Sequence, residues 1–343
     1  MSDGAGLWFE RSDLSNMPLT SIPGWIPAES PFHDGEDEVH DRLGIRSAIE
    51  KQVRRAGIRD YLTDQHQEFF VQLPYLTTGR LDADGQPWAS LRYGAPGFVR
   101  SLDAHTLRIE GHAVEGDPVG AWRVGESLGT LGIQFPTRRR NRANGVVAAV
   151  DAQGATLKVS QTFGNCKKYI QARTCEPADM GLSSVEPDSD RLSDADQQLV
   201  EQADTFFIAS ANLDPKAGLA RGADVSHKGG RPGFVRADDE RTLTIPDFVG
   251  NSYFNTIGNL IRSPRAGLLF IDFETGDLLF AAARTEVLWD DPQTAGFAGA
   301  LRLMRFHLQQ VRRCHHVLPL SWSAPEYADQ LARTGTWKEL ATV

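Results

Sequence analysis

The 343-residue sequence has little cysteine, and the cysteines present form no recognisable pattern. Cys166, Cys175 and Cys314 are too few for a disulfide framework, and none of them has the CxxC spacing of a zinc site. No apolar run approaches the roughly 18 residues that a membrane-spanning helix needs, and the acidic N-terminus lacks the apolar segment of a secretory signal. We therefore expect a cytoplasmic protein with neither a membrane span nor a metal site.

Basic residues are fewer than acidic ones. The chain has 36 lysines and arginines against 45 aspartates and glutamates, which gives a net charge of −9. Proteins that bind nucleic acids or anionic membranes usually present a basic face, so we expect neither partner. The glycine-rich GxGxxG motif of a dinucleotide-binding domain is missing after any predicted strand. The 41% hydrophobic and 24% charged residues are typical of a folded globular protein.

Two distant segments of the chain resemble each other. Residues 96–110 read PGFVRSLDAHTLRIE and residues 232–246 read PGFVRADDERTLTIP, so nine of 15 positions are identical. LGIQF at 131–135 similarly matches LFIDF at 269–273, and Phe69-Phe70 is predicted to match Phe206-Phe207. The spacing is far longer than that of a solenoid repeat. We therefore predict two diverged copies, each forming a domain.

Each copy is dominated by short strand-like segments in meander order, which predicts a small closed or nearly closed barrel. Asp84-Gly85 is a hairpin turn signal between two of these segments. Thr63 and Ser193 are predicted to cap short helices, and residues 250–265 to contain another. The predicted organisation is an irregular N-terminal arm (1–60), barrel 1 (61–180), a linker (181–196), barrel 2 (197–317) and a C-terminal tail (318–343).

The acidic cluster between His33 and His40 has no recognised ligand spacing, and we interpret it as a solvated part of the arm. Cys314-His315-His316 invites a metal interpretation. Adjacent residues point apart on a helix or a strand, however, so we interpret this tripeptide as surface.

Residues 224–273, with TRRRNRANG (137–145) and QTFGNCKKYIQ (161–171), resemble the flavin-nucleotide-binding branch of the pyridoxamine 5′-phosphate oxidase-like superfamily. The resemblance extends over roughly residues 32–325. It implies a mainly β fold of two tandem FMN-binding split β-barrels. Such barrels usually pair as two-fold dimers with the flavin between them. The tandem copies would therefore form an intrachain pseudo-dimer.

The resemblance also implies where the FMN phosphate lies. The loop before the helix in the second copy, followed by small polar residues, suits an anion because backbone N–H groups converge there. Arg138, Arg140 and Arg142 alternate in a predicted strand and therefore share a face. Arg140 and Arg142 would supply the cation that the second copy lacks, reaching across from the first barrel. The remaining candidate residues are the phosphate-loop residues Asn251, Asn255 and Thr256, the strand and turn residues Ser226, Lys228, Arg231, Gly233, Phe234 and Val235, and the pocket-closing residues Gln161, Asn165 and Tyr169.

The function implied is that of an FMN-dependent oxidoreductase acting on a small molecule. Reducing equivalents would come from NAD(P)H or a partner reductase, and a further homodimer is possible. No residue stands out as a general acid or base. Two alternatives remain open at this stage: a non-catalytic flavin-binding or carrier module, and a split-barrel protein that binds or degrades haem.

Overall fold

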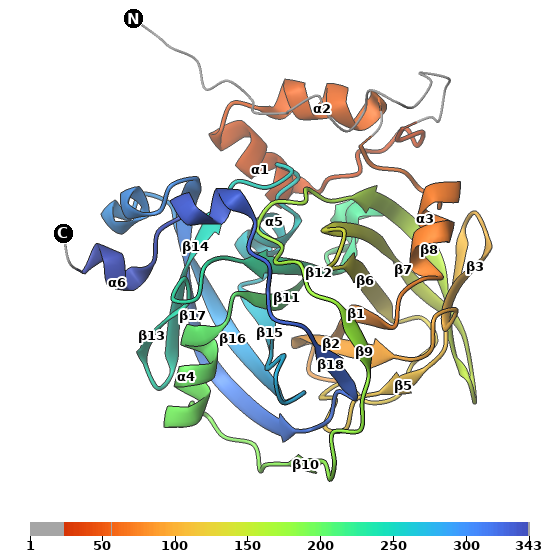
Figure 1. The fold of residues 1–343 in the computed structure, drawn as a ribbon. Helices are drawn as coiled ribbons and strands as arrows, with labels where there is room; N and C mark the ends of the chain where they lie inside the picture. The colour runs from red at the N-terminus through yellow and green to blue at the C-terminus, as the bar shows by residue number, and fades with distance from the viewer. Residues whose placement is uncertain (1–23, 56, 342–343) are drawn as a thin grey trace, which may run out of the picture.

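The computed structural model describes residues 24–55 and 57–341, and the chain is mainly β (Figure 1). Its first sheet has the strand order β3-β4-β8-β7-β6-β1-β2-β5, with antiparallel neighbours. The bounds are β1 (Tyr75–Leu81), β2 (Pro87–Tyr93), β3 (Val99–Asp103), β4 (Thr106–Ile109), β5 (His112–Ala113), β6 (Ser127–Gln134), β7 (Arg139–Asp151) and β8 (Gly154–Gly164).

The second sheet repeats this arrangement with the order β12-β11-β15-β16-β17-β14-β13. When it is read backwards, each strand matches its counterpart in the first sheet, with only β5 unmatched. The strands are β11 (Thr205–Asn212), β12 (Gly222–Gly229), β13 (Arg236–Asp239), β14 (Thr242–Phe248), β15 (Arg265–Ile271), β16 (Leu278–Leu288) and β17 (Ala300–His315). Short strands β10 (Ser184–Val185) and β9 (Cys175–Pro177) pair with β17 and with β18 (Leu320–Trp322), respectively.

The three largest apolar clusters among the described residues hold the two sheets together. One lies inside the first sheet and includes Phe70, Leu76 and Leu157. A second lies inside the second sheet. The third is shared, because Trp88 of β2 and Phe280 of β16 belong to the same buried cluster. The two curled sheets therefore pack against each other within one chain, as the sequence predicts for a pseudo-dimer.

Two glycines let the sheets approach closely at equivalent places. Gly129 of β6 lies so near β12 that a Cβ there would be 2.7 Å from the Cα of Asp224. Gly267 of β15 lies against β2, where a Cβ would be 2.5 Å from the Cα of Trp88. The matched segments LGIQF and LFIDF place these two glycines at the same relative position in the two sheets. The two contacts therefore relate the halves by an approximate two-fold axis.

We expect Gly129→Ala to destabilise the protein by about 1–3 kcal/mol, because the added methyl group would force two backbones apart. Urea denaturation would measure the change. Gly164→Ala is the matched control, since the nearest atom to a Cβ there lies 3.5 Å away on the Asn141 side chain. Equal stability of the Gly129 and Gly164 variants would contradict close packing between the sheets.

The helices lie outside and between the sheets (Figure 1). As predicted, Thr63 caps α3 and Ser193 caps α4. Among the described residues, no helix is long and apolar enough to cross a membrane. The helices are α1 (Asp34–Arg42), α2 (Arg46–Arg55), α3 (Asp64–Phe70), α4 (Asp194–Gln202), α5 (Asn255–Arg262), α6 (Trp337–Leu340) and the 3₁₀ segments η2 (Pro215–Ala220), η3 (Pro292–Gly296) and η4 (Asp329–Arg333).

The structure corrects three interpretations of the sequence. The described part of the arm is not irregular and solvated. It forms α1 and α2, and His33 and Glu36 are buried. The first 23 residues of the arm lie outside the described residues. Phe69-Phe70 ends α3, whereas Phe206-Phe207 lies in β11, so these pairs are not equivalent. Cys314 is fully buried rather than on the surface, because β17 turns its side chain into the shared core.

Candidate functional site

A hollow of about 110 Å³ lies where β7 of the first sheet faces β12 and α5 of the second half. The segment after β8 and the loop before α5 close its sides. Most of the residues proposed from the sequence line it: Arg140, Arg142, Asn165, Tyr169, Ser226, Lys228, Phe234, Asn251, Asn255 and Thr256. These residues come from both halves of the chain.

Arg142 crosses from β7 to the second half and is almost fully buried. Its Nη1 donates to Asp224 Oδ2 at 2.9 Å and to Asn255 Oδ1 at 3.1 Å, and its Nη2 donates to Ser226 Oγ at 2.7 Å. The Thr256 hydroxyl donates to the same Ser226 oxygen at 2.9 Å. The guanidinium therefore fixes the polar side chains at one end of the hollow.

Arg140, two residues earlier on β7, lines the same hollow. Its Nη1 donates to the Nδ1 of His227 at 3.1 Å, and its Nε donates to the Cys166 carbonyl at 2.9 Å. Burial, with a smaller effect from neighbouring Arg142, lowers the pKa of Arg140 to about 10. Arg140 stays charged at neutral pH, so two adjacent cations face the hollow and favour an anion.

Helix α5 begins at this hollow without a side-chain cap among the described residues. Phe254, at the N-cap position, has φ = 57° and its side chain accepts no hydrogen bond. The first backbone N–H groups of a helix lack partners inside the helix and carry a partial positive charge. The first-turn residues Asn255, Thr256 and Ile257 line the hollow together with Ser226.

The backbone around the hollow is strained. Tyr169, Ser252 and Phe254 all have positive φ, between 57° and 64°. This region is unfavourable for residues with a Cβ, and such strain concentrates at functional sites. Arg138 also has a positive φ, of 53°, and it lies in the turn that leads into β7 and Arg140. The strain therefore supports a functional role for this hollow.

The other end of the hollow is partly aromatic. The rings of Tyr169 and Phe248 stack with centroids 5.0 Å apart and planes 20° apart. Burial raises the pKa of Tyr169 to about 12, so its hydroxyl stays protonated. Lys228 Nζ donates to Asp247 Oδ1 at 2.6 Å on the same wall. This end could hold a flat aromatic group with polar edges.

Four proposed residues lie elsewhere. Gln161 donates to the Pro31 carbonyl at 2.7 Å, and Arg231 pairs with Glu339 at the surface. Gly233, with φ = 88°, supports the turn before β13. Val235 packs in the core of the second sheet. The sequence groups Arg231, Gly233 and Val235 with Lys228 because they follow it closely, but the chain turns after Gly229 and carries these three away from the hollow.

Sequence reasoning also missed residues near the site. Asp224 alternates with Ser226 and Lys228 along β12, so strand periodicity could have placed it on the same face. His227 is held neutral because burial, and then nearby Arg140, keep its pKa well below the usual range. Nothing in the local sequence signals the buried Glu36 of α1.

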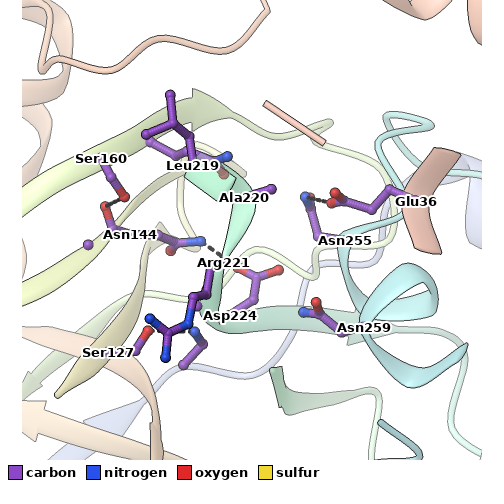
Figure 2. A pocket seen from close by; sticks show the side chains of 14 residues that line it. Glu36, Ser127, Asn144, Ser160, Leu219, Ala220, Arg221, Asp224, Asn255 and Asn259 are labelled. Atoms are coloured by element: carbon purple, nitrogen blue, oxygen red, sulfur yellow. Dashed lines mark hydrogen bonds between the residues drawn. The ribbon is translucent and has the colours of Figure 1, made fainter. Parts of the chain in front are cut away.

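A smaller hollow of about 20 Å³ shares Asn255 with the main hollow, and Figure 2 shows the residues that line it. Glu36 and Asn255 approach it from one side, and Asn144 and Asp224 from the other. Asn144 Nδ2 donates to Asp224 Oδ1 at 2.8 Å. Asp224 and Asn255 thus separate this polar hollow from Arg142.

The position related to the main hollow by the approximate two-fold axis is filled. The strand registers place Phe280 where the other side has Arg142, and Trp88 where it has Asp224. Both are at most 1% exposed within the shared core. An ion pair on one side is therefore replaced by apolar packing on the other.

The chain resembles several solved structures weakly. A putative pyridoxamine 5′-phosphate oxidase from Lactobacillus delbrueckii is 15% identical, with a TM-score of 0.28, over 36% of this chain and 94% of that one. A FAD-binding protein from Mesorhizobium loti is 14% identical, with a TM-score of 0.27, over 39% of this chain and 99% of that one. The inhibitor of motility MotI/DgrA from Bacillus subtilis is 8% identical, with a TM-score of 0.22, over 77% of this chain and 93% of that one.

No protein-family model matches the chain, and no curated protein matches it. At such low TM-scores the solved structures add no argument about the site, which depends on the geometry described above.

Proposed function

We propose that the main hollow binds flavin mononucleotide and that the protein is an oxidoreductase acting on a small molecule. The observation that carries this proposal is the uncapped start of α5 facing two arginines from the other half. We also propose that the two halves are diverged copies, in view of their matching sequence segments and strand order.

The donors at the α5 end fit a phosphate dianion. A phosphate needs cations and hydrogen-bond donors that converge on its oxygens. Arg140, Arg142, the Ser226 and Thr256 hydroxyls and the first turn of α5 supply them within one hollow. The Nε of Arg142 has no hydrogen-bond partner among the described residues, although it is buried.

The aromatic end fits a flat ring system. Tyr169 and Phe248 provide a stacked apolar wall, and Lys228 provides a cation held in place by Asp247. A bound flavin would supply the electron-transfer chemistry, while the protein contributes binding, orientation and electrostatics. Lys228 is the cation best placed to stabilise negative charge on the ring, because Arg231 faces Glu339 instead.

We expect one flavin per chain. A symmetric pair of barrels would have two equivalent sites, but here Phe280 and Trp88 fill the second position. Titration of the protein with FMN, followed by quenching of flavin fluorescence, should reach its end point at one equivalent. An end point at two equivalents would contradict the sealed second position.

The proposed function is tested by the spectrum and chemistry of the purified protein. Bound flavin absorbs at about 370 and 450 nm. Bleaching of these bands by NADPH, followed by turnover, would support an oxidoreductase function. A flavin that is bound but never turns over, with NADPH or with a partner reductase, would favour a carrier. A Soret band after haem addition, with no affinity for FMN, would overturn the proposal.

A further inference from the structure

Helix α1 lies outside both sheets but is closely joined to α5 (Figure 1). A Cβ on Gly35 would be 2.3 Å from the Gly258 carbonyl oxygen, so the two backbones touch. His33 Nε2 hydrogen-bonds with Asn259 Oδ1 at 3.0 Å, and Arg262 pairs with Asp34 at 2.9 Å. Helix α1, from the N-terminal region, therefore packs along α5.

Glu36 is the residue of α1 that reaches the site. Its side chain is buried, with Oε2 accepting from the His33 backbone N–H at 2.9 Å and Oε1 accepting from Asn255 Nδ2 at 2.5 Å. The Oδ1 of the same Asn255 accepts from Arg142. A continuous chain of hydrogen bonds thus joins Glu36 through Asn255 to Arg142. Figure 2 shows the bond between Glu36 and Asn255.

We propose that Glu36 is a positioning residue for Asn255 and Arg142, and that it takes up a proton when an anion binds beside them. This inference rests on the proposed function, because FMN phosphate is the anion considered. It adds a proton-linked step to binding that a simple electrostatic site would lack.

The charges around Glu36 explain the direction of the effect. Burial raises the pKa of Glu36 well above the usual carboxyl range, and Asp224 of β12 and Asp37 of α1 raise it further. Arg142 of β7 is the nearest cation in the hydrogen-bond chain and already pairs with Asp224. An arriving anion would engage Arg142 and add negative charge, so the neutral form of Glu36 would be favoured.

Two other titratable groups lie near Glu36, and each already interacts with other residues. At the N-cap of α1, His33 Nε2 lies 3.7 Å from Glu36 Oε2, and burial lowers the pKa of His33. On α5, Arg262 pairs outward with Asp34 and Glu38. Asp224 is the second buried carboxyl group here, and burial raises its pKa too, but its ion pair with Arg142 favours its charged form. We therefore assign the proton uptake to Glu36, and the Glu36→Gln variant below tests that assignment.

The smaller hollow offers the proton a route. It is lined by Glu36 and Asp224 inside and by the exposed residues Leu219 and Arg221 at its rim. Its volume of about 20 Å³ is sufficient for one water molecule. A proton could therefore pass from solvent to Glu36 without opening the main hollow.

Calorimetric titration of the full-length protein with FMN tests the inference. Heats measured in two buffers of different ionisation enthalpy, between about pH 5 and 9.5, give the number of protons exchanged. FMN phosphate itself titrates near pH 6 and releases protons on binding as the dianion. Above that pH we expect net uptake approaching one proton, with the Kd rising up to tenfold per pH unit.

Glu36→Gln should still bind FMN but lose the proton uptake, since the amide accepts from Asn255 and does not ionise. Glu38→Gln, on the exposed side of α1, should keep the uptake of the wild-type protein. Uptake that persists unchanged in Glu36→Gln would overturn the inference, as would its absence from the wild type.

A second measurement needs no variant. Infrared difference spectra of the wild-type protein, taken with and without FMN, should gain the carbonyl stretch of a newly protonated carboxyl group. FMN binding without this band would reject the role of Glu36 but leave the proposed function intact. Failure of the wild-type protein to bind FMN at all would instead reject the site.

Discussion

Replacing Arg140 with alanine is expected to weaken FMN binding at least tenfold. A hydrogen bond to a charged group contributes roughly 1.5–3 kcal/mol, and Arg140 of β7 lines the hollow in which we propose that the phosphate binds. It forms no ion pair with a carboxylate among the described residues, so its loss leaves no buried negative charge behind. Fluorescence titration with FMN would measure the change.

Arg231→Ala is the matched control for Arg140→Ala. Both substitutions remove one guanidinium, but Arg231 pairs with Glu339 outside the hollow. We expect the FMN affinity of this variant to equal that of the wild-type protein within error. A loss of affinity in Arg231→Ala, or none in Arg140→Ala, would place the phosphate elsewhere.

Arg142→Ala is expected to destabilise the fold by about 3–5 kcal/mol, because removing one partner leaves Asp224 buried and charged. The two side chains are each at most 6% exposed. Chemical denaturation would measure the loss. Arg142 is therefore a poor choice for a binding test by itself, since lost affinity and lost stability would be confounded.

The double variant Arg142→Met with Asp224→Leu separates the two effects. Buried ion pairs replaced by apolar residues of similar volume often keep or gain stability. We expect this variant to be more stable than Arg142→Ala while failing to bind FMN. If the double variant were less stable than Arg142→Ala, contacts of the two side chains other than their ion pair would have to stabilise the fold.

The sequence predicted the elements of the site that depend on local periodicity. Alternation along β7 placed Arg140 and Arg142 on one face, and small polar residues marked the start of α5. The alternation argument fails at Arg138, which precedes β7. A positive φ turns its backbone there, and its guanidinium bonds to the Ile170 carbonyl and to Glu326.

The parts that escaped prediction depend on contacts between distant segments. Glu36 reaches Asn255 only because α1 packs against α5 through Gly35 and Gly258. An acidic segment near the N-terminus looks solvated when it is read locally, since its partner lies more than 200 residues away. Long-range packing of this kind has no periodic signature in the sequence.

Joining two barrels in one polypeptide frees them from having identical surfaces. In a symmetric homodimer, a substitution at one pocket is also made at the other, so a tryptophan that closes one would close both. Here Phe280 and Trp88 occupy one side, while Arg142 and Asp224 remain on the other. The apolar packing of Phe280 and Trp88 on one side can therefore offset the free-energy cost of burying Arg142 and Asp224 on the other.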